Sequence, residues 1–132
     1  MGTRSLTYIK EKSDTSHTLN IYKQFDGHPY AWGCQLAEFL SSKEIVNGIG
    51  NKQDFTKANS TACLIAQLVS EKKTEVGGLY IVPVDSKDWD QEYEYYIEVC
   101  DNTGSVYIKI YDTWDKKLVF NGTPRELINK YK

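Results

Sequence analysis

The sequence is short of cysteine and histidine, and it has no long apolar run. Its three cysteines, Cys34, Cys63 and Cys100, form no CxxC pair, and their odd number fits free thiols rather than a disulfide framework or a structural zinc site. No stretch approaches the ~18 to 20 apolar residues of a membrane span, and the N-terminus lacks the basic-then-apolar order of a signal peptide. We therefore expect a soluble, cytoplasmic protein that uses no metal, no cofactor and no membrane.

The sequence also has no large excess of positive or negative charge. The chain has 16 basic and 18 acidic residues, a formal charge of −2, which is too balanced for a protein that neutralises phosphates along a duplex. Non-specific nucleic-acid binding is therefore disfavoured. The GxGxxG, P-loop, HExxH and GxSxG patterns are all absent, so we do not expect an enzyme.

The first half of the chain predicts two strands followed by two helices. Residues 3–12 and 18–25 are rich in β-branched and aromatic side chains and flank a polar turn, which is typical of a hairpin. Apolar side chains then recur at helical spacing over residues 30–42 and again over residues 58–69. The second apolar stripe is broad, so it predicts a buried helix.

The second half predicts strands and one closing helix. Alternating or compact apolar patterns predict strands over residues 79–84, 92–99 and 106–111, with a further one over 118–120. Thr123-Pro124-Arg125-Glu126 is a capping box with proline at the first helical position. The order ββααβββ(β)α predicts a single α+β domain over residues 1–132, with an antiparallel or mixed sheet of five to six strands and helices mainly on one face.

The first hairpin offers a candidate binding face. If it pairs symmetrically about Thr15, Tyr8 lies opposite Tyr22 and Arg4 opposite Asp26. The other face of this hairpin is expected in the core and holds Ile9, Leu19, Ile21 and Phe25. The candidate face combines flat aromatic rings with an arginine, an amide and a carboxylate, which can stack on a base and bond its edges or phosphates. An ordinary solvent face with an Arg4–Asp26 pair fits the same pattern equally well.

The junction after this hairpin runs from a strand through a tight turn into a helix. A phosphate could sit at the helix N-terminus near Lys23 or His28, or Asp26 could simply cap that helix. With the hairpin face, this junction defines the candidate ligand-binding residues Arg4, Tyr8, Tyr22, Lys23, Gln24, Asp26, His28 and Trp32.

Two other features support different functions. Seven acids lie between Asp85 and Asp101, beside Trp89, and could face a basic protein partner; a solvated loop and strand face is the simpler interpretation. Cys34 lies close in sequence to His28 and Asp26, which would suit a thiol or phosphodiesterase-like enzyme, but Cys34 also fits a small buried core thiol.

Several motifs together resemble a known family. These are the opening MGTRSLT, then Tyr22-Lys23-Gln24-Phe25-Asp26-Gly27-His28-Pro29, Ala62-Cys63-Leu64-Ile65-Ala66-Gln67-Leu68, Gly77-Gly78-Leu79-Tyr80 and Phe120-Asn121-Gly122-Thr123-Pro124. The chain is similar to small uncharacterised proteins of bacteriophages and some bacteria that carry a Y-[RK]-Q-[FY]-D-G-x-P segment. It departs from their pattern with Lys23 in place of arginine, Ala31 in place of glycine, and a lengthened polar stretch over residues 56–60.

The resemblance implies a phage setting and no established activity. Small phage proteins of this kind are frequently counter-defence factors, and one class sequesters nucleotide signals of bacterial immunity. The leading hypothesis is therefore a non-enzymatic protein that holds a small nucleotide-derived ligand of the cyclic nucleotide or cyclic ADP-ribose type. We expect a homo-oligomer, because a second copy would enclose a shallow sheet face. An acidic inhibitor of a host defence protein and a small enzyme are the alternatives.

Overall fold

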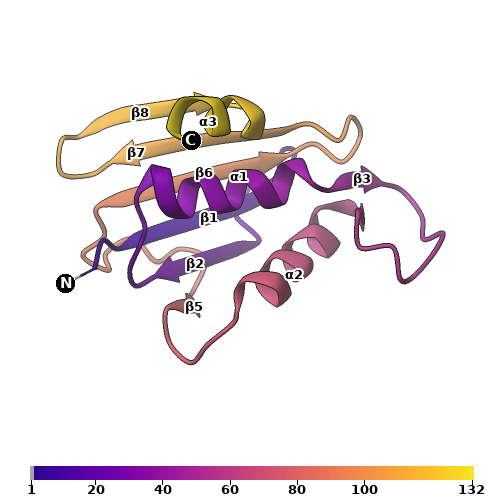
Figure 1. The fold of residues 1–132 in the computed structure, drawn as a ribbon, viewed down its shortest axis with the longest axis horizontal. Coiled ribbons are helices and arrows are strands. Elements are labelled where there is room, and N and C mark those ends of the chain that lie inside the picture. The colour runs from indigo at the N-terminus through magenta and orange to yellow at the C-terminus, as the bar shows by residue number, and fades with distance from the viewer. Residues whose placement is uncertain (1) are drawn as a thin grey trace.

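The computed structural model describes residues 2–132, so Met1, which opens the family-like motif, lies outside it. It is an α+β fold with a six-stranded mixed sheet, a small two-stranded sheet and three α-helices (Figure 1), as the sequence predicted. The elements are β1 (Ser5–Glu11), β2 (Leu19–Lys23), the π-helical turn η1 (Pro29–Gly33), α1 (Cys34–Ser41), β3 (Glu44–Val46), β4 (Lys57–Asn59), α2 (Ser60–Lys72), β5 (Leu79–Ile81), β6 (Tyr93–Val99), β7 (Val106–Asp112), β8 (Lys117–Gly122) and α3 (Pro124–Tyr131).

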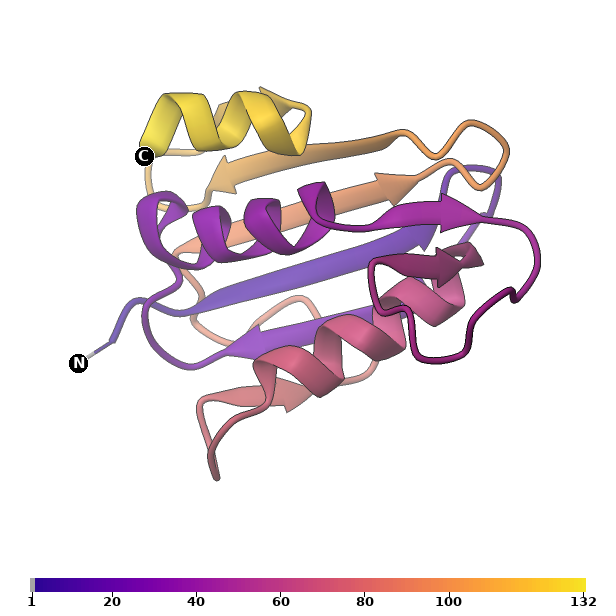
Figure 2. The same ribbon diagram turned by 45° about the vertical axis from the view of Figure 1, so that its right-hand side comes forward.

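The large sheet has the strand order β5-β2-β1-β6-β7-β8. The central strands β1 and β6 run parallel, and the other neighbouring pairs are antiparallel. All three α-helices lie on one side of this sheet (Figures 1 and 2), as the sequence predicted. The opposite side, which we call the second face, is therefore free of helices.

The predicted hairpin register is wrong by two residues. β1 and β2 pair Tyr8 with Asn20 and Leu6 with Tyr22. The turn is tighter than expected, because the Asp14 amide donates to the Glu11 carbonyl and centres the turn on Asp14. Side chains alternate with a period of two, so a two-residue shift leaves every side chain on its predicted face. The expected Arg4–Asp26 pair, however, is not formed.

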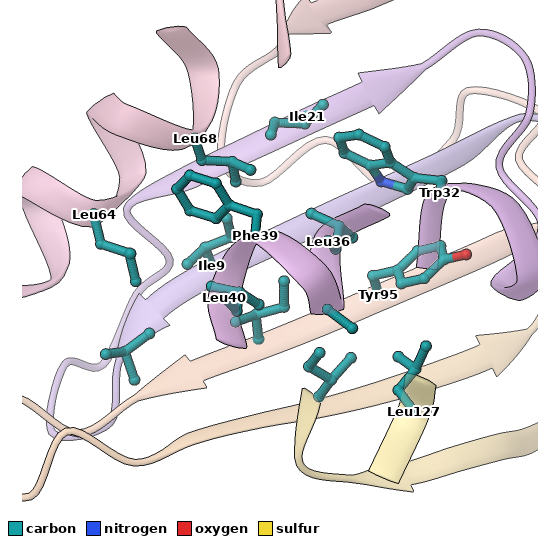
Figure 3. Packing of buried hydrophobic residues seen from close by; sticks show 14 of the residues in the cluster. Ile9, Ile21, Trp32, Leu36, Phe39, Leu40, Leu64, Leu68, Tyr95 and Leu127 are labelled. Carbon is teal, nitrogen blue, oxygen red and sulfur yellow. The ribbon is translucent and has the colours of Figure 1, made fainter. Parts of the chain in front are cut away.

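The core lies between the large sheet and the helices (Figure 3). Trp32 is fully buried there, and its Nε1 donates to Thr7 Oγ1 at 2.9 Å. Tyr95 is also fully buried, and its hydroxyl donates to the Gly27 carbonyl at 2.7 Å. Burying these two large aromatic side chains costs little free energy, because the polar atom of each keeps a hydrogen-bond partner. Phe25 was expected in this core, but it lies beyond the end of β2 and is 38% exposed.

The second helix, α2, is buried on one side only, contrary to the prediction. Its buried residues are Thr61, Leu64, Ile65 and Leu68, whereas Ala62 and Ala66 are exposed. The broad apolar stripe therefore includes alanines that face away from the sheet. Next to this outer side lie β3 and β4, whose three residues each are too few to show a period in the sequence.

The two later helices begin in different ways. The predicted capping box of α3 is present, with the Glu126 amide donating to Thr123 Oγ1 and the Thr123 amide to Glu126 Oε1. At the start of α2, the Thr61 amide and hydroxyl donate to Asp101 Oδ1 at 3.0 and 2.5 Å. Asp101 thus caps a helix from forty residues away, which no local motif could have indicated. None of the helices described over residues 2–132 is long and apolar enough to cross a membrane.

Candidate functional site: a covered tyrosine face and an open groove

Two of the predicted stacking residues are already covered by the chain itself. Residues 82–91, which we call the strap, connect β5 to β6 across the second face, and Tyr8 and Tyr22 beneath it are only 5% and 8% exposed. The Tyr8 hydroxyl donates to the Ser86 carbonyl at 2.6 Å. The Trp89 ring lies against Tyr22 with centroids 4.9 Å apart. A base therefore has no free ring face to stack on at either tyrosine.

The strap is held by polar contacts as well as by rings. Asn20 Nδ2 donates to the carbonyls of Pro83 and Ser86, each at 3.2 Å. Arg4 pairs with Asp90 at 3.0 Å at the exposed edge of the strap. Burial, and secondarily the Glu94 charge, raise the pKa of Tyr8 to about 12. The Tyr8 phenol is therefore a neutral, structural hydrogen-bond donor.

The remaining candidate residues are divided between the two sides of the sheet. Trp32 belongs to the core on the helix side, and the Lys23 ammonium lies 5.4 Å from its ring centroid. Gln24 Oε1 accepts from the Tyr80 hydroxyl at 3.3 Å, near the strap side. The eight residues singled out from the sequence therefore do not surround one cavity.

The junction before α1 is built differently from either expectation. The helix begins with the π-helical turn, and its capping residue is His28, which makes no side-chain capping bond. Asp26 therefore does not cap the helix through its carboxylate; it adopts a positive φ of 61° in the turn, and its carbonyl accepts from the Trp32 amide. His28 Nε2 lies 2.7 Å from Thr3 Oγ1, and the His28 ring stacks on Tyr30. His28 is engaged in holding the N-terminal segment.

The acids between Asp85 and Asp101 lie at different places in the fold, and Cys34 is not suited to act as a nucleophile. Asp85, Asp88 and Asp90 are exposed on the strap, whereas Asp101 caps α2. Burial raises the pKa of the Cys34 thiol, which is the opposite of what a thiolate nucleophile needs. No group of three or more histidine, cysteine or carboxylate side chains that could hold a metal ion occurs within residues 2–132.

A separate hollow lies between α2 and the loop that precedes it. We call it the groove; its volume is about 950 Å³, at the upper end of the range usual for small-molecule sites. The outer side of α2 forms its base, and the 46–57 segment forms its opposite wall. The residues that matter for its chemistry are Lys43, Ile49, Lys52, Asp54, Phe55, Lys57, Cys63, Ala66, Gln67 and Glu71.

The walls of the groove combine apolar surface with amines. Ile49 and Phe55 are exposed on the loop, and the exposed fraction of Phe55 is 61%. They line the same hollow as the small side chains of Cys63 and Ala66. Large apolar side chains left exposed beside a concavity are a common sign of a binding surface. Lys52 makes no ion pair among residues 2–132, so its ammonium is available to an anion.

The loop wall is held in shape by local contacts. Lys43 Nζ donates to the Phe55 carbonyl at 2.6 Å, and Lys57 pairs with Glu44. Hydrogen bonds from the Thr56 hydroxyl and amide hold the pKa of Asp54 below its ordinary value. The loop therefore presents Phe55 from a braced backbone.

One polar atom at the base of the groove has no partner. Gln67 Nε2 donates to the Lys57 carbonyl at 2.9 Å, while the buried Gln67 Oε1 accepts from no donor within residues 2–132. Buried polar atoms are normally paired, so an orphaned acceptor calls for an explanation. Gln67 Oε1 has almost no accessible surface, so a ligand N–H group reaches it only when the Gln67 side chain moves.

Sequence reasoning missed the groove. Its signals were present, since Ile49 and Phe55 stand alone in a polar stretch and the alanines of α2 recur on the side away from Leu64 and Leu68. A period-based search assigns such alanines to the core, because their small side chains count as apolar. Comparison of the chain with family models, with curated proteins and with solved structures gives no significant match.

Proposed function

We propose that this chain is a non-catalytic binding protein that holds a small ligand, flat and apolar at one end and anionic at the other, in the groove. The observation that carries the proposal is the hollow of about 950 Å³ in which exposed Phe55 and Ile49 face the small side chains of α2. Such a pocket encloses a flat ring without distortion of the fold.

Charge supports the anionic end. Three lysines line the groove, Lys43, Lys52 and Lys57, against two acids, Asp54 and Glu71, in a chain whose overall charge is −2. Lys57 is neutralised by its ion pair with Glu44, and Lys43 donates to the Phe55 carbonyl, so the ammonium of Lys52 is the group in the groove that is left to meet a phosphate at its rim. The orphaned Gln67 Oε1 suits an amino group on a ring edge.

A nucleotide-derived signal has this chemistry. A base would lie against Phe55, its amino group near Gln67, and its phosphate near Lys52. The phage setting that the sequence resemblance implies makes cyclic nucleotides and cyclic ADP-ribose isomers the first ligands to test. Sequestration rather than turnover fits a groove that brings together an aromatic ring and amines.

The test is ligand capture. Purified protein is incubated with a panel of cyclic dinucleotides, cyclic ADP-ribose isomers and related nucleotides, separated from unbound ligand, and heated; the released material is identified by mass spectrometry. We expect an intact ligand in stoichiometric amount. Phe55→Ala should reduce capture at least tenfold, whereas Phe25→Ala, which removes a partly exposed ring outside the groove, should leave it unchanged.

Three results would contradict this assignment. Capture that is equal in Phe55→Ala and in the unaltered chain would place the ligand outside the groove. Release of a chemically altered product would show turnover and so an enzyme. Capture of no ligand by the unaltered chain would reject the proposed ligand class.

The strap supports a second candidate, an acidic inhibitor of a basic protein. Asp85 and Asp88 are exposed there and make no ion pair within residues 2–132, and Trp89 beside them is partly exposed. A complex formed through them should weaken steeply with salt. Reversing both charges to lysine should abolish it, while Asp115→Lys, an equally exposed change elsewhere, should not.

A further inference from the structure

The second face of the sheet has an uncovered half. β7 and β8 carry no covering element on this side, since the helices lie on the other (Figures 1 and 2). β6 borders the strap, because Gln91 Nε2 donates to Glu94 Oε2 at 2.8 Å and the Tyr96 ring stacks on Tyr8. We call this half the open face. Its outward side chains are Glu94, Tyr96 and Glu98 from β6, Tyr107, Lys109 and Tyr111 from β7, and Leu118 from β8.

Large apolar groups on the open face remain in contact with water. Tyr107 is 48% exposed and Leu118 is 52% exposed, and Trp114 in the β7–β8 turn is more exposed still. On the strap-covered half the corresponding side chains, such as Tyr8, are buried. Aromatic rings gathered on a flat, uncovered sheet face are typical of protein–protein contacts.

The pairing of β6 with β7 arranges these side chains in three rows. Glu94 lies opposite Tyr111, Tyr96 opposite Lys109, and Glu98 opposite Tyr107. In every row the residue on β6 is an acid or a tyrosine, and the residue on β7 is a tyrosine or a lysine. The Tyr96 hydroxyl also donates to Glu94 Oε1 at 2.8 Å, and Lys10 of β1 pairs with Glu98 at 3.7 Å, so Glu94 is the acid of these rows that makes no ion pair within residues 2–132.

This arrangement is complementary to itself. We infer that the open face binds a second copy of this chain, related by a two-fold axis that runs parallel to the strands between β6 and β7. Such an axis lies in the interface and places β6 of one copy over β7 of the other, as closed dimers require.

Across this axis, each of these residues on β6 of one copy lies over its row partner on β7 of the other copy. The Lys109 ammonium of one copy faces the Tyr96 hydroxyl of the second copy and the Glu94 carboxylate bonded to it. The hydroxyls of Tyr107 and Tyr111 face carboxylates of the second copy. No two charges of the same sign stand opposite each other, so the electrostatics favour this pairing over a random one.

The size of the face sets the strength of the dimer. Two seven-residue strands and β8, at a spacing of ~4.8 Å and a rise of ~3.3 Å per residue, give a flat footprint on the order of 300 Å². Stable interfaces bury about 800 Å² on each partner. The interface is therefore small, and the dimer is weak and dissociates on dilution. This inference is independent of the groove.

Sedimentation equilibrium over a dilution series tests the dimer. The unaltered chain should shift from about twice its mass of 15.2 kDa toward that mass as it is diluted. Lys109→Glu puts an acid between Glu94 and Glu98 of the second copy and should weaken association at least tenfold. Lys12→Glu changes an exposed lysine outside the face and should have no effect, with circular dichroism confirming that each variant is folded.

A charge exchange between two chains makes the test specific. Glu94→Lys with Glu98→Lys in one chain places lysines in the two rows that flank Lys109 of the second copy and should also prevent self-association. Mixed with the Lys109→Glu chain, this variant should form a heterodimer, because the acid at position 109 then lies between two lysines of its partner, and Lys109 of that partner lies between Glu94 and Glu98. A chain that stays monomeric at all concentrations, a Lys109→Glu variant that associates normally, or a mixture that does not recover the dimer would each overturn the inference.

Discussion

The two halves of the second face hold the same kind of residue in opposite environments. Under the strap, Tyr8 and Tyr22 are almost fully buried; on the open face, Tyr107 is about half exposed. All three come from strands whose side chains point alternately to the two faces of the large sheet. The comparison shows that a strand pattern assigns a tyrosine to a face, whereas the covering element decides whether that tyrosine is part of the core or part of a surface.

Covering a face also changes what its polar atoms require. The buried Tyr8 hydroxyl must have a protein partner, and the strap supplies the Ser86 carbonyl. The exposed Tyr107 hydroxyl can be solvated by water or by another chain. The covered half is therefore stabilised by specific internal bonds, while the open half remains available for binding.

The largest expected effect is the difference in stability loss between replacing a buried tryptophan and replacing an exposed one. Trp32→Ala removes a fully buried ring and the bond from Nε1 to Thr7 Oγ1, and should lower the free energy of unfolding by about 3 to 5 kcal/mol. Trp114→Ala removes a largely exposed ring and should change it by less than ~0.5 kcal/mol. Urea unfolding followed by circular dichroism measures both. Similar losses in the two variants would show that burial does not distinguish these positions.

A second, smaller effect is a pH dependence of the free energy of unfolding that comes from the covered half. Tyr8 has its pKa raised from 10.0 to about 12 in the folded chain, so folding holds its phenol neutral. Above pH ~10 the unfolded chain ionises first, and the free energy of unfolding falls as the pH rises toward ~12, by an amount on the order of 2 kcal/mol for this residue. The stability that Tyr8 contributes is fully present below pH ~10.

Two matched variants assign that pH dependence. Tyr8→Phe should flatten the fall in stability between pH ~10 and ~12, because it removes the group that ionises. At neutral pH it should cost about 1 kcal/mol, since the Ser86 carbonyl loses its donor. Tyr107→Phe, on the open face, removes a hydroxyl from a half-exposed ring and should leave the neutral stability unchanged. An identical pH profile in Tyr8→Phe and the unaltered chain would assign the effect to other tyrosines, such as Tyr93, whose pKa is also raised to about 12.

Much of the fold could be predicted from the sequence, because it depends on local patterns. The alternation over β6 and β7, the helical spacing of α1 and the capping box of Thr123 and Glu126 each determine an element through nearby residues. The strap could not be predicted in this way. Its position depends on Tyr8 and Asn20, which lie more than sixty residues away from Ser86.

The candidate site was harder to predict for the same reason. Tyr8 and Tyr22 were correctly assigned to one face, but the sequence could not show that Trp89 already lies against Tyr22. Trp32 was grouped with them through proximity along the chain, although the sheet separates it from them. The groove depends on which side of α2 faces the sheet, and small alanines do not reveal this.

The smallest expected effect concerns the edge of the strap. Arg4 pairs there with Asp90; the Asp90 side chain is 87% exposed and that of Arg4 is 37% exposed, so solvent screens the pair and it should contribute about 0.5 kcal/mol or less. A double-mutant cycle with Arg4→Ala and Asp90→Asn measures it. Asparagine is the right replacement because Asp90 has a positive φ of 61°, which asparagine tolerates and alanine does not. A coupling energy above ~1.5 kcal/mol would show that this ion pair, rather than Trp89 and Tyr8 beneath it, fixes the strap. A coupling near zero, with Tyr8→Phe still costly, would place the attachment of the strap in its buried contacts and leave the Arg4–Asp90 edge free to open.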